Sequence, residues 1–154
     1  MISTLTAPIA TKTQDLELLT FRIGNMLIGV DIHHVKEINC HLQVTRAPHA
    51  EGYVLGVMNL RSDVITVLDF GKLLQLSSSR QGSQSVIVTY DGELIALAVD
   101  RVEDVITMAP TDIAPLPPNF RHMEKRVFQG VYRLESELVL LLDLAEILPA
   151  KPVR

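Results

Sequence analysis

Residues Gly56–Leu74 (GVMNLRSDVITVLDFGKLL) recur further along the chain as Gly130–Leu148 (GVYRLESELVLLLDLAEIL). The two stretches align without a gap at a constant offset of 74 positions, and 7 of the 19 aligned residues are identical. A looser match lies upstream, between Leu18–Asp31 and Val86–Asp100, whose last residues are 69 positions apart. The chain is therefore expected to contain two copies of one unit that form two packed subdomains. Two related but different surfaces on one body suit a protein that joins partners.

Composition bounds the fold class and the partners. The chain of 154 residues is as long as one domain, and a copy of about 65 residues would be marginal alone, so the copies are expected to share a core. The apolar content of 47% fits an ordered globular protein. A net charge of −4 argues against a nucleic-acid partner. Cys40 is the only cysteine, which excludes an internal disulfide and fits a reducing cytosol.

Turn signals divide each copy into short strands. In the second copy Asp91-Gly92 separates Val86–Tyr90 from Leu94–Val99, and Asp-Gly is a strong hairpin signal. Leu94–Val99 is apolar without alternation, which predicts a strand covered on both faces. The fold class is therefore mainly β, with small closed barrels that leave no strand edge exposed. The other predicted hairpins join Leu18–Ile23 to Asn25–Val30, Val54–Leu60 to Val64–Leu68, and the strands on either side of Glu135-Ser136-Glu137.

An aspartate precedes a short helix-like segment at the end of each copy. Asp69 is followed by FGKLL and Asp143 by LAEIL. Asp is a favoured N-cap, and Glu146, three residues after Asp143, resembles a capping box. Asp31 and Asp100 hold matching places at the strand ends of the looser repeat. All four aspartates are therefore interpreted as caps rather than as catalytic acids.

Polar and proline-rich segments predict the domain limits. Residues 1–14 lack the pattern of an export signal and are expected to form a mobile tail ahead of one domain over residues 15–150. The small polar stretch Ser77–Ser85 predicts a boundary between a first subdomain, over about residues 20–80, and a second, over about 83–148. Pro110–Asn119 and Arg121–Arg126 then form a long connection inside the second half.

No membrane-spanning segment is expected. The longest apolar run near the C-terminus, Leu138–Leu142, is far shorter than the ~20 residues that a spanning helix needs. The protein is therefore expected to be cytoplasmic and not to insert into a membrane.

Candidate catalytic and metal-binding groups are sparse. A Cys/His group can bind zinc or activate a nucleophile, and an acidic cluster can hold a cation. Here the spacing and surroundings match no such pattern, so half-buried side chains and a solvated face are the preferred interpretations. A metal or catalytic role is the alternative. We expect no enzymatic activity, no cofactor and no metal. The two groups are His33, His34, Cys40 and His41, and Asp100, Glu103 and Asp104.

The turn after Asn59 differs between the two copies. The buried positions around it are repeated as apolar, but Arg61 is matched by Glu135 and Asn59 by Arg133. Turn residues drift freely on surfaces, which is one explanation. The other is an interface, because an arginine on a rigid strand pair can grip a partner's carboxylate with both arms of its guanidinium.

Three stretches carry a family resemblance: Phe21–Ile38 (FRIGNMLIGVDIHHVKEI), Val44–Leu74 and Leu97–Val105. The most specific part is YVLGVMNLR followed by VITVLDF. These stretches closely resemble the CheW family, the adaptors of bacterial chemotaxis. The resemblance implies two five-stranded, SH3-like barrels, with Asp15–Leu19 lodged in the second barrel. It also implies a non-catalytic role that couples the cytoplasmic tips of methyl-accepting chemoreceptors to the regulatory domain of the histidine kinase CheA. A related adaptor for another sensory or surface-motility pathway, with kinase coupling retained, is the alternative.

The resemblance also implies binding residues. The receptor-binding positions are Val35, Glu37, Gly56, Asn59 and Arg61. The kinase-binding positions are predicted near Gly130 and Leu134.

One residue departs from the family pattern. Ser62, followed by Asp63, stands where the family usually has a glycine. A left-handed backbone at Ser62 would cost about 1–2 kcal/mol. The alternatives are a turn of another shape and an Asp63 that partly neutralises Arg61.

Overall fold

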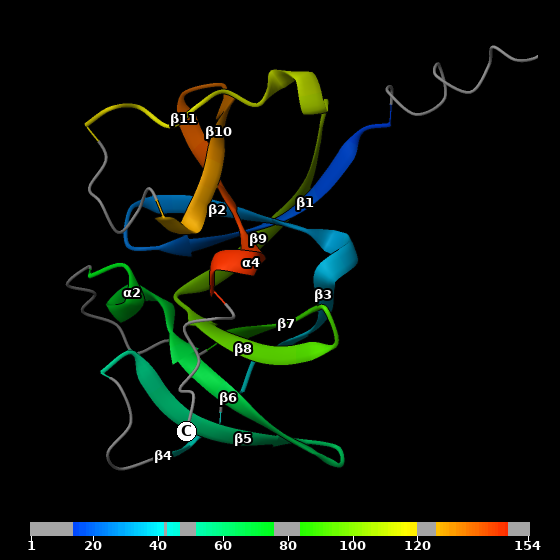
Figure 1. Cartoon of the computed structure of the whole chain (residues 1–154), viewed down its shortest axis with the longest axis vertical. Coiled ribbons are helices and arrows are strands. Elements are labelled where there is room, and N and C mark those ends of the chain that lie inside the picture. The colour runs from blue at the N-terminus through cyan, green and yellow to red at the C-terminus, as the bar shows by residue number, and fades with distance from the viewer. Residues whose placement is uncertain (1–13, 42, 47–51, 76–83, 120–125, 148–154) are drawn as a thin grey trace, which may run out of the picture.

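Two β-sheets make up most of the protein (Figure 1). The computed structural model describes residues 14–41, 43–46, 52–75, 84–119 and 126–147. Sheet A has the strand order β10-β11-β2-β1-β9, and sheet B has the order β3-β7-β8-β6-β5-β4. The mainly β fold class predicted from the sequence is therefore confirmed.

The strands of sheet A are β1 (Leu16–Ile23), β2 (Met26–Asp31), β9 (Arg101–Met108), β10 (Phe128–Leu134) and β11 (Glu137–Leu142). Those of sheet B are β3 (Val35–Asn39), β4 (Thr45–Arg46), β5 (Val54–Leu60), β6 (Asp63–Asp69), β7 (Gln84–Tyr90) and β8 (Glu93–Val99). The described helical turns are η1 (Ile32–His34), α2 (Phe70–Leu73), η2 (Pro110–Asp112) and α4 (Leu144–Ile147).

Each sheet takes strands from both copies of the repeat. The first hairpin, β1–β2, joins the second copy, because β1 pairs with β9 and β2 runs parallel to β11. In the same way β7–β8 joins the first copy, through β3 and β6. Leu16–Leu19 pair with β9 as the resemblance implies, but the rest of their hairpin goes with them. The strand pairing therefore does not follow the expected division near Ser77–Ser85, because hairpin signals are local and do not specify which other hairpin a pair joins.

Some predicted segments are not described. Residues 1–13 of the expected tail, most of Ser77–Ser85 and Arg121–Lys125 of the connection lie outside the described residues. The limits of the whole domain, 15–150, stay a prediction.

The turns show that the upstream repeat has a different offset from the expected one. Gly24-Asn25 connects Ile23 to its partner Met26, and Asp91-Gly92 connects Tyr90 to its partner Glu93. The structural offset is therefore 67 positions (91 − 24), not 69. A shift of two residues keeps every strand side chain on the same face of the sheet, so an alignment at an offset of 69 preserves the same apolar pattern.

A bent segment joins the two edges of each sheet. After β9 the chain passes through η2 to Ala114, which bridges Val131 of β10. After β3 the chain reaches β4, where Thr45 and Arg46 pair with Val57 and Gly56 of β5. Both connections have the closure expected of a small barrel.

The two sheets share a large core, as predicted for copies that are marginal alone. One apolar cluster contains buried residues of both sheets and of α2, and in it the ring centroids of Phe21 on β1 and Phe70 on α2 are 6.0 Å apart. Smaller clusters belong to sheet B alone and to sheet A alone. The β8 strand contributes alternate residues to the shared core and to the sheet B cluster, so Leu94–Val99 is covered on both faces as predicted.

The four repeated aspartates bind backbone N–H groups. The Oδ1 atoms of Asp31, Asp69 and Asp143 accept from residues of η1, α2 and α4, as predicted for caps. Asp100 differs because its Oδ2 atom accepts from the N–H of Gly24 at 2.7 Å, in the turn of another hairpin. At the structural offset of 67, the residue equivalent to Asp100 is His33 and not Asp31, so Asp100 does not share the capping position.

Candidate protein-interaction site

Arg61 and Glu37 form an ion pair on the surface of sheet B. The Nη1 atom of Arg61 lies 2.9 Å from Oε1 of Glu37, although the residues are 24 positions apart in sequence. Arg61 stands at the tip of the β5–β6 hairpin, and Glu37 lies on β3. The side chain of Arg61 is 70% exposed and that of Glu37 is 28% exposed. The fold thus brings together two of the predicted receptor-binding residues and leaves the guanidinium open to solvent.

The tight turn holds the position of Arg61. Only two residues, Arg61 and Ser62, separate the paired residues Leu60 and Asp63. Arg61 has a left-handed backbone with a φ of 57°, whereas Ser62 is not among the described residues with positive φ. The conformational cost of a left-handed backbone therefore falls on Arg61 and not on Ser62. The turn thus has a different shape from one with a left-handed residue at position 62. Glu135, the counterpart of Arg61, has a φ of 49°.

The other predicted receptor-binding residues have different environments. Asn59 is exposed on β5, while Val35 is half-buried and packs against the shared core. Gly56 is buried, and its φ of +154° favours glycine. A Cβ atom there would lie 2.1 Å from the carbonyl oxygen of Thr45. The structure therefore gives Gly56 a structural task, which is to let the closing segment cross β5.

The two predicted kinase-binding residues also have structural tasks. Gly130 is buried, and a Cβ atom there would meet Ile113 at 2.7 Å and the carbonyl oxygen of Ala114 at 2.8 Å. Leu134 is half-buried and packs against the sheet A cluster. Gly56 and Gly130 are thus equivalent residues of the repeat, each beneath the bent segment that closes its sheet.

Sequence reasoning missed a second charged network, on sheet A. Arg22 of β1 bonds through Nε to Glu103 at 3.1 Å and through Nη2 to Glu137 at 2.9 Å. Arg101 is a further partner of Glu103. Burial favours the neutral form of Glu103, but hydrogen bonds from Arg101 and Arg22 outweigh it and lower the pKa of Glu103. The hydrogen bond to Glu137 is the largest cause that raises the pKa of Arg22. No local pattern predicts this network, because its partners lie on three strands that meet only in the fold.

The expected metal and catalytic candidates do not converge. Within the described residues no group of three or more His, Cys, Asp or Glu side chains could hold a metal ion. Cys40 is exposed, and His33 pairs through Nδ1 with Asp31 at 3.0 Å. In the acidic cluster, Glu103 binds arginine and the backbone of Asp104 binds Thr20. Half-buried side chains were expected in the Cys/His group, but only His34 is half-buried, and His33, Cys40 and His41 are exposed. The expected solvated face is found at Asp104, whereas Glu103 is partly buried.

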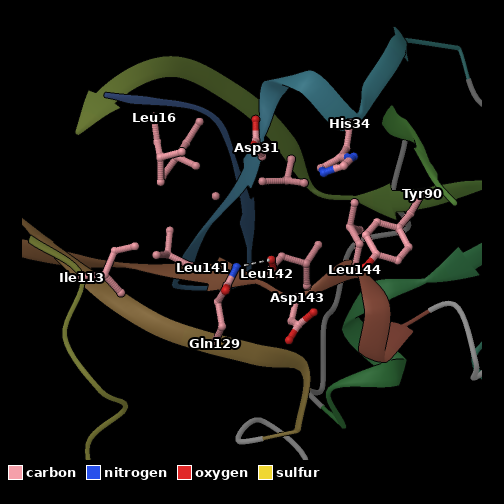
Figure 2. Close-up of a pocket in the computed structure, with 13 residues that line it drawn as sticks. Leu16, Asp31, His34, Tyr90, Ile113, Gln129, Leu141, Leu142, Asp143 and Leu144 are labelled. Atoms are coloured by element: carbon pink, nitrogen blue, oxygen red, sulfur yellow. Dashed lines mark hydrogen bonds between the residues drawn. The ribbon is translucent and has the colours of Figure 1, made fainter. Parts of the chain in front are cut away.

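A pocket of about 360 Å³ opens at one end of sheet A. Figure 2 shows Leu16 and Ile113 on one side and His34 and Tyr90 on the other. Its two carboxylates already have structural partners, since Asp31 accepts from the His33 N–H and Asp143 from the Ala145 N–H. Burial raises the pKa of Asp31, but the hydrogen bonds from the backbone and ring of His33 outweigh this and lower it overall. These contacts favour capping rather than acid–base chemistry for both residues.

The fold and the site together define a small, mainly β protein that carries an exposed arginine at a hairpin tip. The family model for the CheW-like domain matches residues 17–151. The chain is 33% identical to "Chemotaxis protein CheW" of Rhizobium meliloti over 88% of both chains. It is 30% identical to "Chemotaxis protein CheW" of Klebsiella aerogenes, over 93% of this chain and 87% of the relative. The chain therefore belongs to the CheW-like domain family, an adaptor family of chemotaxis signalling.

A solved structure has the same fold. The scaffolding protein TtCheW from Thermoanaerobacter tengcongensis matches with a TM-score of 0.77 at 24% identity, over 84% of this chain and 90% of that chain.

Among the described residues, no helix is long and apolar enough to cross a membrane.

Proposed function

We propose that this protein is a non-catalytic, cytoplasmic adaptor that couples the cytoplasmic tips of chemoreceptors to the regulatory domain of the histidine kinase CheA. Membership of the CheW-like family supports the pathway. Holding kinase and receptor on one body raises the effective concentration of each at the other. The receptor then controls the kinase by shifting the populations of its active and inactive conformations, and the packed sheets of the adaptor transmit this shift.

The observation that carries the receptor site is the Arg61–Glu37 pair. A tight turn places the backbone of Arg61 at a hairpin tip, and its side chain is 70% exposed and bound at one nitrogen. A partner's carboxylate can therefore bind the remaining N–H groups of the guanidinium. Asn59 is exposed on the adjoining strand and extends the surface. We place the receptor contact on this part of sheet B, and the kinase contact on the hairpin that contains Gly130 and Leu134.

Arg61→Glu tests the receptor contact. We expect binding to a purified receptor-tip fragment to weaken at least tenfold, which is about 1.4 kcal/mol, because the new carboxylate repels both Glu37 and the partner's acid. Binding to the kinase regulatory domain should change little. Titration calorimetry with each purified partner measures both affinities.

A double variant separates contact from scaffold. Glu37→Arg combined with Arg61→Glu restores an ion pair at the same place with its charges exchanged. If Arg61 or Glu37 touches the receptor, the double variant stays weak, whereas recovery of receptor binding shows that the pair only links the hairpin to β3. Unchanged binding of both partners to Arg61→Glu removes Arg61 from the site.

A further inference from the structure

A seam lies between two strands of sheet B that do not pair with each other. The edges of this sheet are β3 and β4, and β4 pairs with Gly56 and Val57 of β5. Past Val57 a depression of about 240 Å³ opens between Asn39 on β3 and Met58–Asn59 on β5. We call this depression the β3–β5 seam.

The side chains that line the seam form hydrogen bonds but carry no formal charge. Three of them are carboxamides, those of Asn39, Gln43 and Asn59. Among the described residues that line the seam there is no Asp, Glu, Lys or Arg. The amide oxygen of Asn39 accepts from the His41 N–H at 2.9 Å, which leaves the NH2 group of Asn39 to donate elsewhere. The seam therefore suits a polar ligand that is uncharged.

A buried hydroxyl adds another polar group on the inner side of the seam. Ser85 lies directly opposite Asn39 in the β3–β7 pair, so the two side chains point to the same face of the sheet. Ser85 has no exposed surface, and no described residue forms a hydrogen bond with its Oγ atom. A buried polar group is rarely left without a partner in a folded protein. The Ser85 hydroxyl is thus an unpartnered group next to the seam.

Sheet A has apolar side chains at the equivalent positions. The repeat offsets of 67 and 74 match Asn39 with Ile106, Ser85 with Leu18, and Met58 with Tyr132. Leu18 belongs to the sheet A cluster, and Ile106 and Tyr132 pack against that cluster. Two of the three positions are therefore polar in sheet B and apolar in sheet A. Because the polar set leaves a buried hydroxyl without a partner, it favours a role in binding over a role in packing.

The seam adjoins the proposed receptor contact. Asn59 lies two residues before Arg61 on β5, and Asn39 lies two residues after Glu37 on β3. Two residues along a strand span about 6.6 Å. This distance is close to the roughly 5–6 Å between side chains one turn apart on a helix. One segment of a partner can therefore reach the guanidinium of Arg61 and the seam together.

We propose that the β3–β5 seam binds the carboxamide of a glutamine or asparagine side chain, from the same receptor segment whose carboxylate binds Arg61. The identity of this partner rests on the proposed function. The carbonyl oxygen of the carboxamide accepts from the NH2 group of Asn39, and its own NH2 group donates to the Ser85 hydroxyl. The half-buried Val44 and the buried Met58 contact the aliphatic stem. Arg61 thus selects an acid and the seam selects a neutral amide, which makes the surface specific for two side chains in one arrangement.

Three small probes of nearly the same shape test the ligand chemistry. Butyramide has the donor and the acceptor of a glutamine side chain, 2-pentanone has only the acceptor, and butyrate carries a charge. In two-dimensional amide NMR spectra of the full chain, we expect butyramide to shift the signals of Asn39, His41 and Met58–Asn59. At equal concentration these shifts should be at least fivefold larger than with either of the other probes. Equal shifts with 2-pentanone or with butyrate overturn the proposal.

Two variants test the polar partners one at a time. Asn39→Asp keeps the acceptor for the His41 N–H but loses the NH2 donor, and Ser85→Ala removes the hydroxyl. We expect each to weaken the butyramide response at least threefold. Asn25→Asp, the same substitution at an exposed position in the β1–β2 turn, is the control and leaves the response unchanged. An undiminished response in either seam variant contradicts the assignment.

A double-mutant cycle tests the partner. Each Gln of a purified receptor-tip fragment is changed in turn to Met, and each Asn to Leu. One of these changes should lower the affinity for the wild-type chain at least fivefold and have little effect on the affinity for Asn39→Asp. If no change meets both conditions, no receptor carboxamide occupies the seam and the proposal is wrong. If the wild-type chain does not bind the fragment at all, the adaptor function fails, while the probe tests on the isolated chain still decide the chemistry of the seam.

Discussion

Gly56→Ala is expected to destabilise the protein by about 3 kcal/mol or more, because the added methyl has no room and the backbone is unfavourable for it. The new Cβ atom would lie 2.1 Å from the Thr45 carbonyl oxygen and 2.8 Å from Val44. The obstacle is backbone rather than the end of a flexible side chain, so it cannot rotate away. Chemical unfolding in urea, followed by circular dichroism, measures the change in free energy of unfolding.

Two further glycines calibrate this result. Gly130→Ala should cost less, since its nearest contacts are at 2.7 and 2.8 Å and its φ is not positive. Gly52→Ala should be close to neutral because a Cβ atom there meets nothing within 4 Å. An order other than Gly56, Gly130, Gly52 contradicts the closing role of the bent segments.

Arg22→Met is expected to cost about 2 kcal/mol at neutral pH, because it leaves the Glu137 carboxylate without its cation and leaves the partly buried Glu103 with Arg101 alone. The figure is at the low end for such a loss, since the Arg22 and Glu103 side chains are 21% and 22% exposed and Glu137 is 40% exposed. Methionine keeps most of the aliphatic stem, so the loss reports the guanidinium. Arg22→Lys keeps the positive charge but not the planar guanidinium, so its stability should lie between that of the wild type and that of Arg22→Met.

The effect of Arg22→Met should depend on pH. The pKa of Glu103 is below its ordinary value of 4.5 in the folded protein, so its contribution is present above that value and is lost as pH falls through the lower, folded pKa. The difference in stability between wild type and variant should therefore shrink in acid. A difference that is constant from pH 7 down to pH 3 would show that packing, not charge, makes Arg22 important.

Arg22 and Arg61 show how one repeated scaffold carries two kinds of charged contact. The network of Arg22 has two carboxylate partners and is partly buried, whereas Arg61 has one and is 70% exposed. An exposed single pair contributes about 0–1 kcal/mol to stability. Arg61 can therefore exchange Glu37 for a partner at little cost, while Arg22 holds three strands together.

Local features of this protein could be predicted from the sequence. The hairpins around Asp91-Gly92 and Arg61-Ser62, the buried strand Leu94–Val99 and the caps at Asp69 and Asp143 all depend on residues close together in the chain. The family resemblance also named both members of the Arg61–Glu37 pair, although not their contact.

Only the tertiary structure decided how these pieces combine. The exchange of hairpins between the copies pairs strands that are not neighbours in the chain. The bond from Gly24 to Asp100 and the bonds from Arg22 to Glu103 and Glu137 join residues that are 76 or more positions apart. The sequence by itself determined the strands, turns and shared core, because periodicity and turn chemistry act over a few residues. It did not determine which strand edges pair, because that choice depends on the total burial of both sheets. No single segment of the sequence carries a pattern that specifies it.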